Sequence, residues 1–254
     1  NVAFRKVAPA LVAGNCAILK PSEIAGLSCM FIGKLAQDAG IPAGVFSVVT
    51  GDRDAGAALA VAPSVSMISF TGSSLTGSKI MNACAPKLSQ VALELGGKSA
   101  LVVFDDTDLD QAVETTMKGF LTNGGQICTA HTRLVVQDGL KTPLLDKLKE
   151  ELEKLPFCND PITEKDRGDR AWEAGMTDVV QPVVCESQHQ KILGFLDEAK
   201  AAGVEVVTGG GVPDAETVGN SGGYFIQPTV LTDVGRDADV WQKEVFGPVL
   251  SVRS

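Results

Sequence analysis

Residues 67–97 read MISFTGSSLTGSKIMNACAPKLSQVALELGG and carry the clearest signal of how the chain folds. The pattern predicts a strand over MISFTGS, a helix over SLTGSKIMNACA and a second strand over QVALELGG. Two strands separated by a helix of about ten residues are typical of a βαβ unit, in which the strands run parallel. We therefore expect an α/β fold built on parallel sheets.

The same alternation continues on both sides of this unit. Further strands are predicted at residues 16–20, 45–51, 100–104, 133–139, 204–210, 224–234 and 247–252. Further helices are predicted at residues 27–40, 54–62, 108–121, 144–155 and 188–203. Residues 159–180 are polar and lack periodicity, which favours a loop or excursion. We place the boundary between two parallel-sheet domains, residues 1–96 and 97–254, within LGGKS (95–99), because a Gly-Gly pair lets the chain cross.

Composition restricts the possible functions. The chain has 254 residues, of which 44% are hydrophobic and 21% are charged, as is ordinary for a globular protein. The formal net charge of -9 argues against nucleic acid as the main partner, because phosphate neutralisation needs Lys and Arg. No window approaches the apolar length of a membrane span, so we expect no membrane partner.

The cysteines point to a reducing environment. Six are scattered without a CxxC pair, and only two histidines accompany them, so we expect no metal site. The compartment predicted is the cytoplasm or an organelle matrix. Both ends of the sequence lie in or beside apolar segments, so we expect a central piece of a longer chain, with any targeting signal outside it.

Two residues invite a chemical interpretation. Cys128 follows Gly-Gly-Gln-Ile; most intracellular cysteines are structural, but Gly124 and Gly125 would let the backbone approach a ligand. Glu94 lies in the apolar run VALEL, where desolvation would raise its pKa toward that of a useful base. Alternatively, strand alternation turns Glu94 to solvent.

Two further motifs suit a nucleotide. In FTGSSLTG (70–77), a strand ends at Gly72-Ser73 and turns into a helix that contains Gly77, which would offer backbone N–H groups to a pyrophosphate. A plain turn explains it equally, and the motif is not GxGxxG. In KPSE (20–23), Lys20 and Glu23 could hold ribose hydroxyls. The alternative is a helix start with Pro at its first position.

The motifs in combination, and in this order, resemble those of the aldehyde dehydrogenase superfamily. They are LKPSE (19–23), FTGSSLTG (70–77), LELGGKSA (93–100), GGQICTAHTR (124–133), IQPTVLTDV (226–234) and EVFGPV (244–249). The spacing from Glu94 to Cys128 also agrees with that family, and the resemblance covers essentially the whole chain. FTGSSLTGSKIM, GQIC and VWQKEVFGPVL are most similar to the betaine-aldehyde and aminoaldehyde dehydrogenases.

The resemblance implies a reaction. Cys128 would attack an aldehyde to give a thiohemiacetal, pass hydride to a nicotinamide and leave a thioester. Glu94 would be the general base for the thiol or for the hydrolytic water. The product would be a carboxylic acid, and the substrate a small aldehyde such as betaine aldehyde or an aminoaldehyde.

The resemblance also implies a cofactor and an organisation. The cofactor would be NAD, with NADP possible, and Glu23 near the ribose favours NAD. Lys20 and Glu23 would hold the adenosine ribose, Gly72, Ser73 and Gly77 would face the pyrophosphate, and Glu244 and Phe246 would position the nicotinamide ribose and ring. Residues 1–96 would be part of the NAD-binding domain and residues 97–254 part of the catalytic domain. The complete protein would be a homodimer or homotetramer.

Three features depart from the family pattern. The family's Pro-Trp-Asn segment, with its oxyanion-stabilising Asn, would lie before the first residue. Thr122 stands where many relatives have an aromatic residue, which removes one wall of a cage for a quaternary ammonium. The stretch 159–181 is long, and the family's Gly-Pro is replaced by Gln181-Pro182.

Two rival functions remain. One is a CoA-acylating or phosphorylating relative; Glu94 counts against the CoA-acylating branch. The other is a non-catalytic structural or interaction protein with the same fold, against which the combination of Cys128, Glu94, Lys20 and Glu23 counts.

Overall fold

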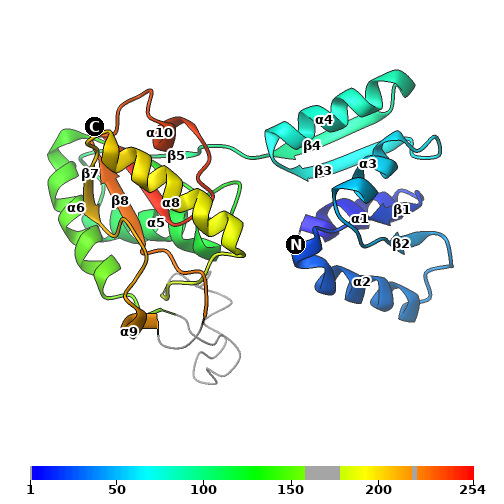
Figure 1. Cartoon of the computed structure of the whole chain (residues 1–254), viewed down its shortest axis with the longest axis horizontal. Helices are drawn as coiled ribbons and strands as arrows, with labels where there is room; N and C mark the ends of the chain where they lie inside the picture. Colours follow the sequence, from blue (N-terminus) through cyan, green and yellow to red (C-terminus); the bar gives the residue numbers. More distant parts are fainter. Residues whose placement is uncertain (1, 158–177, 219–221) are drawn as a thin grey trace. The chain divides into compact units, whose positions relative to one another are not determined.

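The computed structural model describes residues 2–157, 178–218 and 222–254 and shows two compact units (Figure 1). Unit 1 is Asn1–Gly96 and unit 2 is Gly97–Ser254. The chain passes from one unit to the other within LGGKS, at the Gly-Gly pair. Most of the stretch 159–181, predicted to be a loop, lies outside the described residues.

Unit 1 consists of short parallel strand pairs and helices. Its strands are β1 (Ala17–Leu19), β2 (Phe46–Val48), β3 (Met67–Gly72) and β4 (Gln90–Leu95). Its helices are α1 (Val2–Val12), α2 (Gly26–Asp38), α3 (Arg53–Val61) and α4 (Ser74–Cys84), with 3₁₀ turns at Glu23–Ala25 and Ala85–Lys87. The strands pair β1 with β2 and β3 with β4, each pair parallel. The predicted βαβ unit is therefore confirmed as β3-α4-β4, whereas α1 was not predicted.

Helices α3 and α4 begin at side-chain caps. The Asp52 carboxylate accepts a hydrogen bond from the Asp54 amide at 3.0 Å, and the Ser73 hydroxyl accepts one from the Thr76 amide at 3.2 Å. Such caps satisfy amide groups that have no partner within the helix. The two helices meet at small buried residues, where the Cys84 thiol lies 3.7 Å from the Ala60 carbonyl oxygen.

Unit 2 has one five-stranded sheet in the order β5-β6-β9-β8-β7. The strands are β5 (Ala100–Val103), β6 (Arg133–Val136), β7 (Glu205–Thr208), β8 (Thr229–Thr232) and β9 (Val249–Arg253). The helices are α5 (Leu109–Leu121), α6 (Asp138–Glu153), α8 (Glu186–Ala201), α9 (Ala215–Val218) and α10 (Asp239–Gln242), with a 3₁₀ turn at Thr122–Gly125.

The edge strand β7 corrects the expectation of a wholly parallel sheet. It pairs antiparallel with β8, while the other neighbours in the sheet pair in parallel. A parallel crossover needs a long connection, usually with a helix. In the described part of the β7–β8 connection the only helix is the four-residue α9, so the chain returns beside the strand that it left.

The core of unit 2 has two halves, one on each face of the sheet. Val230, Leu250 and Val252 pack with α5 and α6, whereas Leu231 and Val249 pack with α8. Because successive strand residues point to opposite faces and both faces are covered, β8 and β9 are buried on both sides along almost their whole length. The result is a helix–sheet–helix arrangement (Figure 1).

Several predicted boundaries are wrong. The strand predicted at 133–139 ends at Val136, and the helix predicted from residue 144 begins at Asp138. Asp138 places an acidic residue in the first turn of α6, which suits the helix dipole. Gly139, expected at the end of the strand, lies inside this helix, and a Cβ there would lie 3.1 Å from the Asp105 carboxylate. The strand predicted at 224–234 is limited to Thr229–Thr232, directly after Pro228, which has no N–H to donate.

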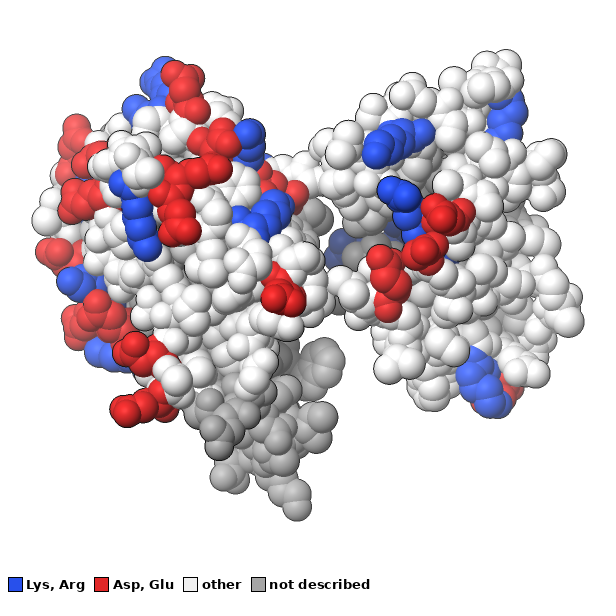
Figure 2. Space-filling view, in the orientation of Figure 1, with Lys and Arg blue, Asp and Glu red and all other residues white. Residues whose placement is uncertain are grey.

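The surface and the helices add two observations. On the face shown in Figure 2, Lys and Arg side chains are interspersed with Asp and Glu, so that face offers no continuous basic surface to a phosphate backbone. Among the described helices, none is both long enough and apolar enough to cross a membrane.

Candidate active site

Cys128 lies in a turn between α5 and β6 of unit 2. The Ala130 amide donates to the Ile127 carbonyl oxygen at 3.0 Å, which closes the turn around the cysteine. The thiol is free and the residue is exposed. Cys128 is therefore not buried in this chain, and its role as a nucleophile stays a prediction.

The backbone before Cys128 is left-handed over three consecutive residues. Asn123, Gly124 and Gly125 have φ angles of 56°, 62° and 72°. Asn tolerates this region better than most residues, and its side-chain amide donates to the Gln126 carbonyl oxygen at 3.1 Å. The Gln126 side chain donates to the Asn123 carbonyl oxygen at 3.1 Å and accepts from the Val184 amide at 2.9 Å. These bonds fix the loop that presents the thiol.

The residues after Cys128 are fixed against α5. The His131 amide donates to the Gly119 carbonyl oxygen at 2.8 Å. A Cβ at Gly119 would lie 2.7 Å from Nδ1 of His131 and 2.9 Å from its Cβ, so the imidazole occupies the space that a side chain would need. Gly119 is therefore a packing position for the cysteine loop within α5.

The EVFGPV loop touches the cysteine loop through backbone. A Cβ at Gly125 would lie 2.2 Å from the Gly247 carbonyl oxygen, and one at Gly247 would lie 2.4 Å from Cδ1 of Ile192. Gly125 thus allows a close approach of the EVFGPV loop, while the approach of Gly124 and Gly125 to a ligand stays a prediction. Cys128 and the half-buried pair Glu244 and Phe246 accordingly belong to two loops in direct contact.

Glu244 lies near Lys98, a cation that was not identified from the sequence. Its carboxylate accepts a bond from the Gly97 amide at 3.4 Å. The pKa of Lys98 is lowered to about 8, chiefly by burial and also by the charge of Arg133, while the charge of Glu244 acts in the opposite direction. Within the described residues, the buried Lys98 ammonium has no hydrogen-bond partner. A lysine directly after Gly-Gly and before an apolar strand was the available sequence signal.

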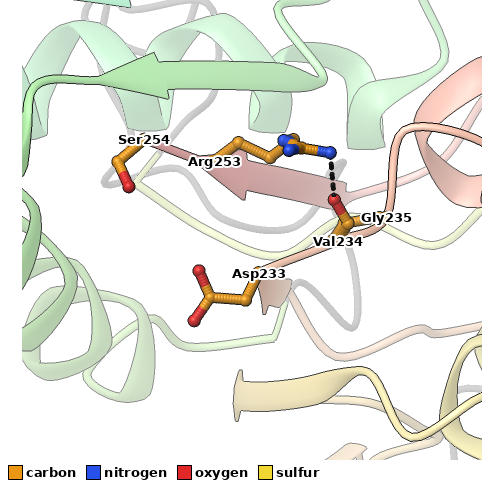
Figure 3. A pocket seen from close by; sticks show the side chains of 5 residues that line it. All are labelled: Asp233, Val234, Gly235, Arg253 and Ser254. Atoms are coloured by element: carbon orange, nitrogen blue, oxygen red, sulfur yellow. Dashed lines mark hydrogen bonds between the residues drawn. The ribbon is translucent and has the colours of Figure 1, made fainter.

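Arg133, at the start of β6, and Arg253, at the end of β9, both lie near Trp241. Each guanidinium lies 5.6 Å from the centre of the Trp241 ring, a cation–π geometry. Arg253 also donates to the Val234 carbonyl oxygen at 2.9 Å, in a cavity of about 230 Å³ (Figure 3). That cavity is lined by Asp233, Val234, Gly235, Arg253 and Ser254. It contains none of the predicted site residues.

In unit 1, Lys20 and Glu23 lie together after β1. The Lys20 ammonium is 3.9 Å from the Glu23 carboxylate, and the two side chains are 18% and 62% exposed. Glu23 begins a 3₁₀ turn, and the preceding Ser22 makes no side-chain cap. The structure therefore offers an exposed carboxylate next to a partly buried ammonium, a donor and acceptor set suited to ribose hydroxyls.

The Gly72–Gly77 segment divides into different roles. Ser73 caps α4. Backbone amides in the first turn of any helix lack partners within the helix and can bind an anion. Gly77 is buried, its amide donates to the Ser73 carbonyl oxygen at 2.9 Å, and a Cβ there would lie 2.8 Å from Leu95. In this structure Gly77 allows α4 to pack on β4, and its role beside a pyrophosphate stays a prediction. Gly72 similarly leaves room for the Phe70 ring.

Glu94 is exposed near the end of β4, whereas Val91, Ala92 and Leu93 before it are half-buried. A residue that sequence reasoning missed lies near it. The Lys6 ammonium, from α1, donates to the Ser69 hydroxyl at 2.8 Å. Burial lowers the pKa of Lys6, and the charge of Glu94 acts against that shift. The apolar sequence around Lys6 gave no indication that this lysine would bind Ser69 and lie near Glu94.

The predicted site residues are thus distributed over both units. Unit 1 carries Lys20, Glu23, Gly72, Ser73, Gly77 and Glu94, and unit 2 carries Cys128, Glu244 and Phe246. In the described ranges, no group of three or more His, Cys, Asp or Glu side chains is arranged to hold a metal ion.

Comparison with known proteins assigns the family. Aminoaldehyde dehydrogenase 1, peroxisomal, from Pisum sativum is 44% identical over 250 residues, which are 98% of this chain and 46% of that protein. The crystal structure of an NAD-dependent aldehyde dehydrogenase from Sinorhizobium meliloti has a TM-score of 0.88 at 34% identity and covers 99% of this chain and 47% of its own. A double mutant of betaine aldehyde dehydrogenase from Staphylococcus aureus, in complex with NAD+, has a TM-score of 0.87 at 33% identity, with 98% and 47% covered.

The chain therefore spans about half the length of the relatives that it matches. Over its own length the match is complete, because the profile of the Aldehyde dehydrogenase family covers residues 1–254. The chain belongs to the aldehyde dehydrogenase family.

Proposed function

We propose that the protein to which this chain belongs oxidises an aldehyde to a carboxylic acid with NAD(P)+. The observation that carries the proposal is the exposed Cys128 thiol, on a loop held in backbone contact with the loop of Glu244 and Phe246. Membership of the aldehyde dehydrogenase family supports it. Unit 1 would be part of the NAD-binding domain and unit 2 part of the catalytic domain.

The chain offers groups that suit the cofactor. Lys20 and Glu23 present a cation and a carboxylate to ribose hydroxyls, and the N-terminus of α4 at Ser73 suits a pyrophosphate. Glu244 and Phe246 offer a carboxylate and a ring to the nicotinamide half. NAD(P)+ supplies, when bound, the acceptor for a hydride. NAD is the preferred cofactor in this proposal because Glu23 would repel a 2′-phosphate.

Cys128 and Glu94 would act in successive steps of the reaction. The Cys128 thiolate attacks the carbonyl carbon to form a C–S bond, and the oxygen takes up a proton in the thiohemiacetal. Loss of hydride from that carbon, together with loss of the proton from the oxygen to solvent, leaves a thioester; bound NAD(P)+ would be the hydride acceptor. Glu94 takes a proton from the water that attacks the thioester, and the C–S bond breaks to release the acid and return Cys128.

For the substrate we propose a primary aminoaldehyde in preference to betaine aldehyde. The name of the Pisum sativum relative supports an aminoaldehyde. Thr122 supports the preference, because its hydroxyl donates to the Lys118 carbonyl oxygen at 2.7 Å and it provides no aromatic face for a quaternary ammonium. We also propose a homodimer or homotetramer in a reducing compartment.

The test is NADH formation by the purified protein, as its gene encodes it, with a series of aldehydes. Aminoaldehyde, betaine aldehyde and simple alkyl aldehydes would be compared, each with and without CoA, and Cys128→Ser would be the control. We expect CoA-independent NADH formation that Cys128→Ser abolishes. An absolute need for CoA would indicate an acylating enzyme, and NAD binding without turnover of any aldehyde would indicate a non-catalytic protein.

A further inference from the structure

His131 is the third residue after Cys128 and ends the loop that carries the thiol. This loop leaves α5 at Thr122, the C-cap of the helix. It returns to the same helix at His131, whose amide donates to the Gly119 carbonyl oxygen at 2.8 Å. The two ends of the loop therefore meet on the last turn of α5, as the ends of a compact surface loop do. The contact between His131 and Gly119 closes the loop at its base.

The His131 ring fills the space that Gly119 leaves on α5. A Cβ on Gly119 would lie 2.7 Å from Nδ1, 2.9 Å from Cβ and 3.1 Å from Cγ of His131. Contacts this short leave no room for any side chain at residue 119 while the ring stays in place. Gly119 and the ring thus fit each other, and a change in either one should disturb the base of the loop.

The His131 ring packs against the helix and is not placed as a base for the thiol. Its Nδ1 is buried and has no hydrogen-bond partner in the part of the chain that the structure describes. A proton on Nδ1 would be a buried donor without an acceptor, so the neutral ring carries its proton on Nε2. Nδ1 lies against Gly119, where it is not positioned to take a proton from Cys128.

The backbone on both sides of His131 is fixed. Between the thiol and the ring, the Ala130 amide donates to the Ile127 carbonyl oxygen at 3.0 Å and closes a turn. After the ring, Thr132 is buried, and its carbonyl oxygen accepts from the Ser251 amide of β9 at 3.0 Å. A displacement of the ring would therefore be passed to the thiol through one turn of backbone.

We propose that His131 is a positioning residue for Cys128: its ring, packed on Gly119, determines where the loop presents the thiol to the aldehyde and the cofactor. This inference rests on the proposed function. The groups proposed for the adenosine ribose, Lys20 and Glu23, belong to unit 1 and not to this loop. Loss of the ring should therefore lower the rate of the chemical step and leave cofactor affinity unchanged.

The experiment is a double-mutant cycle in the protein as its gene encodes it. His131→Ala empties the space on α5, Gly119→Ala adds a methyl group that clashes with the ring, and the double variant has the methyl group without the ring. Gly194→Ala is the control for an added methyl group, because a Cβ there meets no described group within 4 Å. Rapid mixing with saturating NAD would measure hydride transfer, and steady-state kinetics would give the KM for NAD.

We expect His131→Ala and Gly119→Ala each to slow hydride transfer by about 10–100-fold, as misplacement by about 1 Å does, with the KM for NAD unchanged. The double variant should be no slower than His131→Ala alone, because the clash disappears with the ring. Gly194→Ala should keep the parent rate. Losses that multiply in the double variant would overturn the inference. Parallel losses of rate and of NAD affinity would show a general structural defect and would also overturn it.

Hydrogen–deuterium exchange separates this inference from the proposed function, because it needs no turnover. The amides of residues 122–131 should exchange faster in both single variants than in the parent. Faster exchange in a protein that oxidises no aldehyde would support the closure of the loop by His131 and refute the proposed function. Unchanged exchange would overturn the inference whether or not the parent is active. Faster exchange with an unchanged hydride-transfer rate would overturn the positioning role.

Discussion

Gly125 and Gly247 are in backbone contact: a Cβ on Gly125 would lie 2.2 Å from the Gly247 carbonyl oxygen. Gly125 also has a φ of 72°, so an alanine there meets both a clash and an unfavourable backbone region. We predict that Gly125→Ala lowers the free energy of unfolding by at least about 2 kcal/mol, measured by urea denaturation.

Gly194→Ala is the matched control for this prediction. Gly194 lies in α8 and is exposed, and a Cβ added there would meet no neighbouring group of the described residues within 4 Å. Alanine should therefore raise the unfolding free energy by up to about 1 kcal/mol. A Gly125→Ala protein as stable as its parent would show that the two loops separate readily.

Cys128→Ala should abolish aldehyde oxidation while cofactor binding persists. Loss of a covalent nucleophile should cost at least about 100-fold in rate, equivalent to about 2.7 kcal/mol in the barrier. Steady-state NADH formation and cofactor titration would measure the two effects. Activity within tenfold of the parent would refute the assignment.

Iodoacetamide labelling gives a second measurement on Cys128. The buried Cys84 is the protected control, whereas Cys16 proves to be exposed and serves as an accessible comparator. We expect labelling in the order Cys128, Cys16, Cys84. Equal labelling rates at Cys128 and Cys16 would mean that exposure alone, without any activation of the thiol, explains the reactivity of Cys128.

Glu94→Gln should slow thioester hydrolysis more than hydride transfer. An amide takes no proton from the attacking water, and loss of a general base is typically worth about 10²–10⁴ in rate. Rapid mixing should show a burst of NADH followed by a slow steady state. Equal slowing of both phases, without a burst, would limit Glu94 to activation of the thiol.

Glu23→Gln should narrow the difference between NAD and NADP. The Glu23 carboxylate is exposed beside Lys20, where it can accept from a 2′-hydroxyl but would repel a 2′-phosphate. Lys20 attracts the same phosphate, so the parent's preference should be moderate. The substitution should act mainly by lowering the KM for NADP. A parent protein with a higher kcat/KM for NADP than for NAD would contradict this role of Glu23.

Lys98 should make the stability of unit 2 depend on pH. Its pKa is about 8 in the folded chain, against an ordinary 10.5, chiefly because of burial. Between these values the unfolded chain holds a proton that the folded chain lacks, so the unfolding free energy should rise with pH from about 8 to about 10.5. Below pH 8 the buried charge costs up to about 3 kcal/mol.

Lys98→Met should therefore stabilise the protein at neutral pH and lose that advantage as the pH rises. Both tryptophans of the chain lie in residues 97–254, so tryptophan fluorescence during urea unfolding reports on unit 2. The exposed Lys149→Met is the control. A stability difference independent of pH would contradict the burial of a charged Lys98.

Strand–helix alternation was sufficient to predict most of the fold. The β3-α4-β4 unit follows directly from its apolar periodicity. Cys128 and Glu244 were assigned from motif order, and their roles stay predictions. The antiparallel pairing of β7 was not predictable, because it depends on what the following connection contains. Lys98, Lys6 and His131 were missed because their settings arise from burial and from contacts with groups distant in sequence, which periodicity does not record.

Because the His131 ring packs against Gly119, the residues at these two positions should depend on each other among relatives. An imidazole at 131 requires glycine at 119, although glycine inside a helix costs about 1 kcal/mol relative to alanine. Where a relative has a small residue at the position of His131, helix propensity should favour alanine opposite it. The two positions should therefore covary among homologues, and transplanting either residue alone into a relative should impair folding, whereas transplanting both should not.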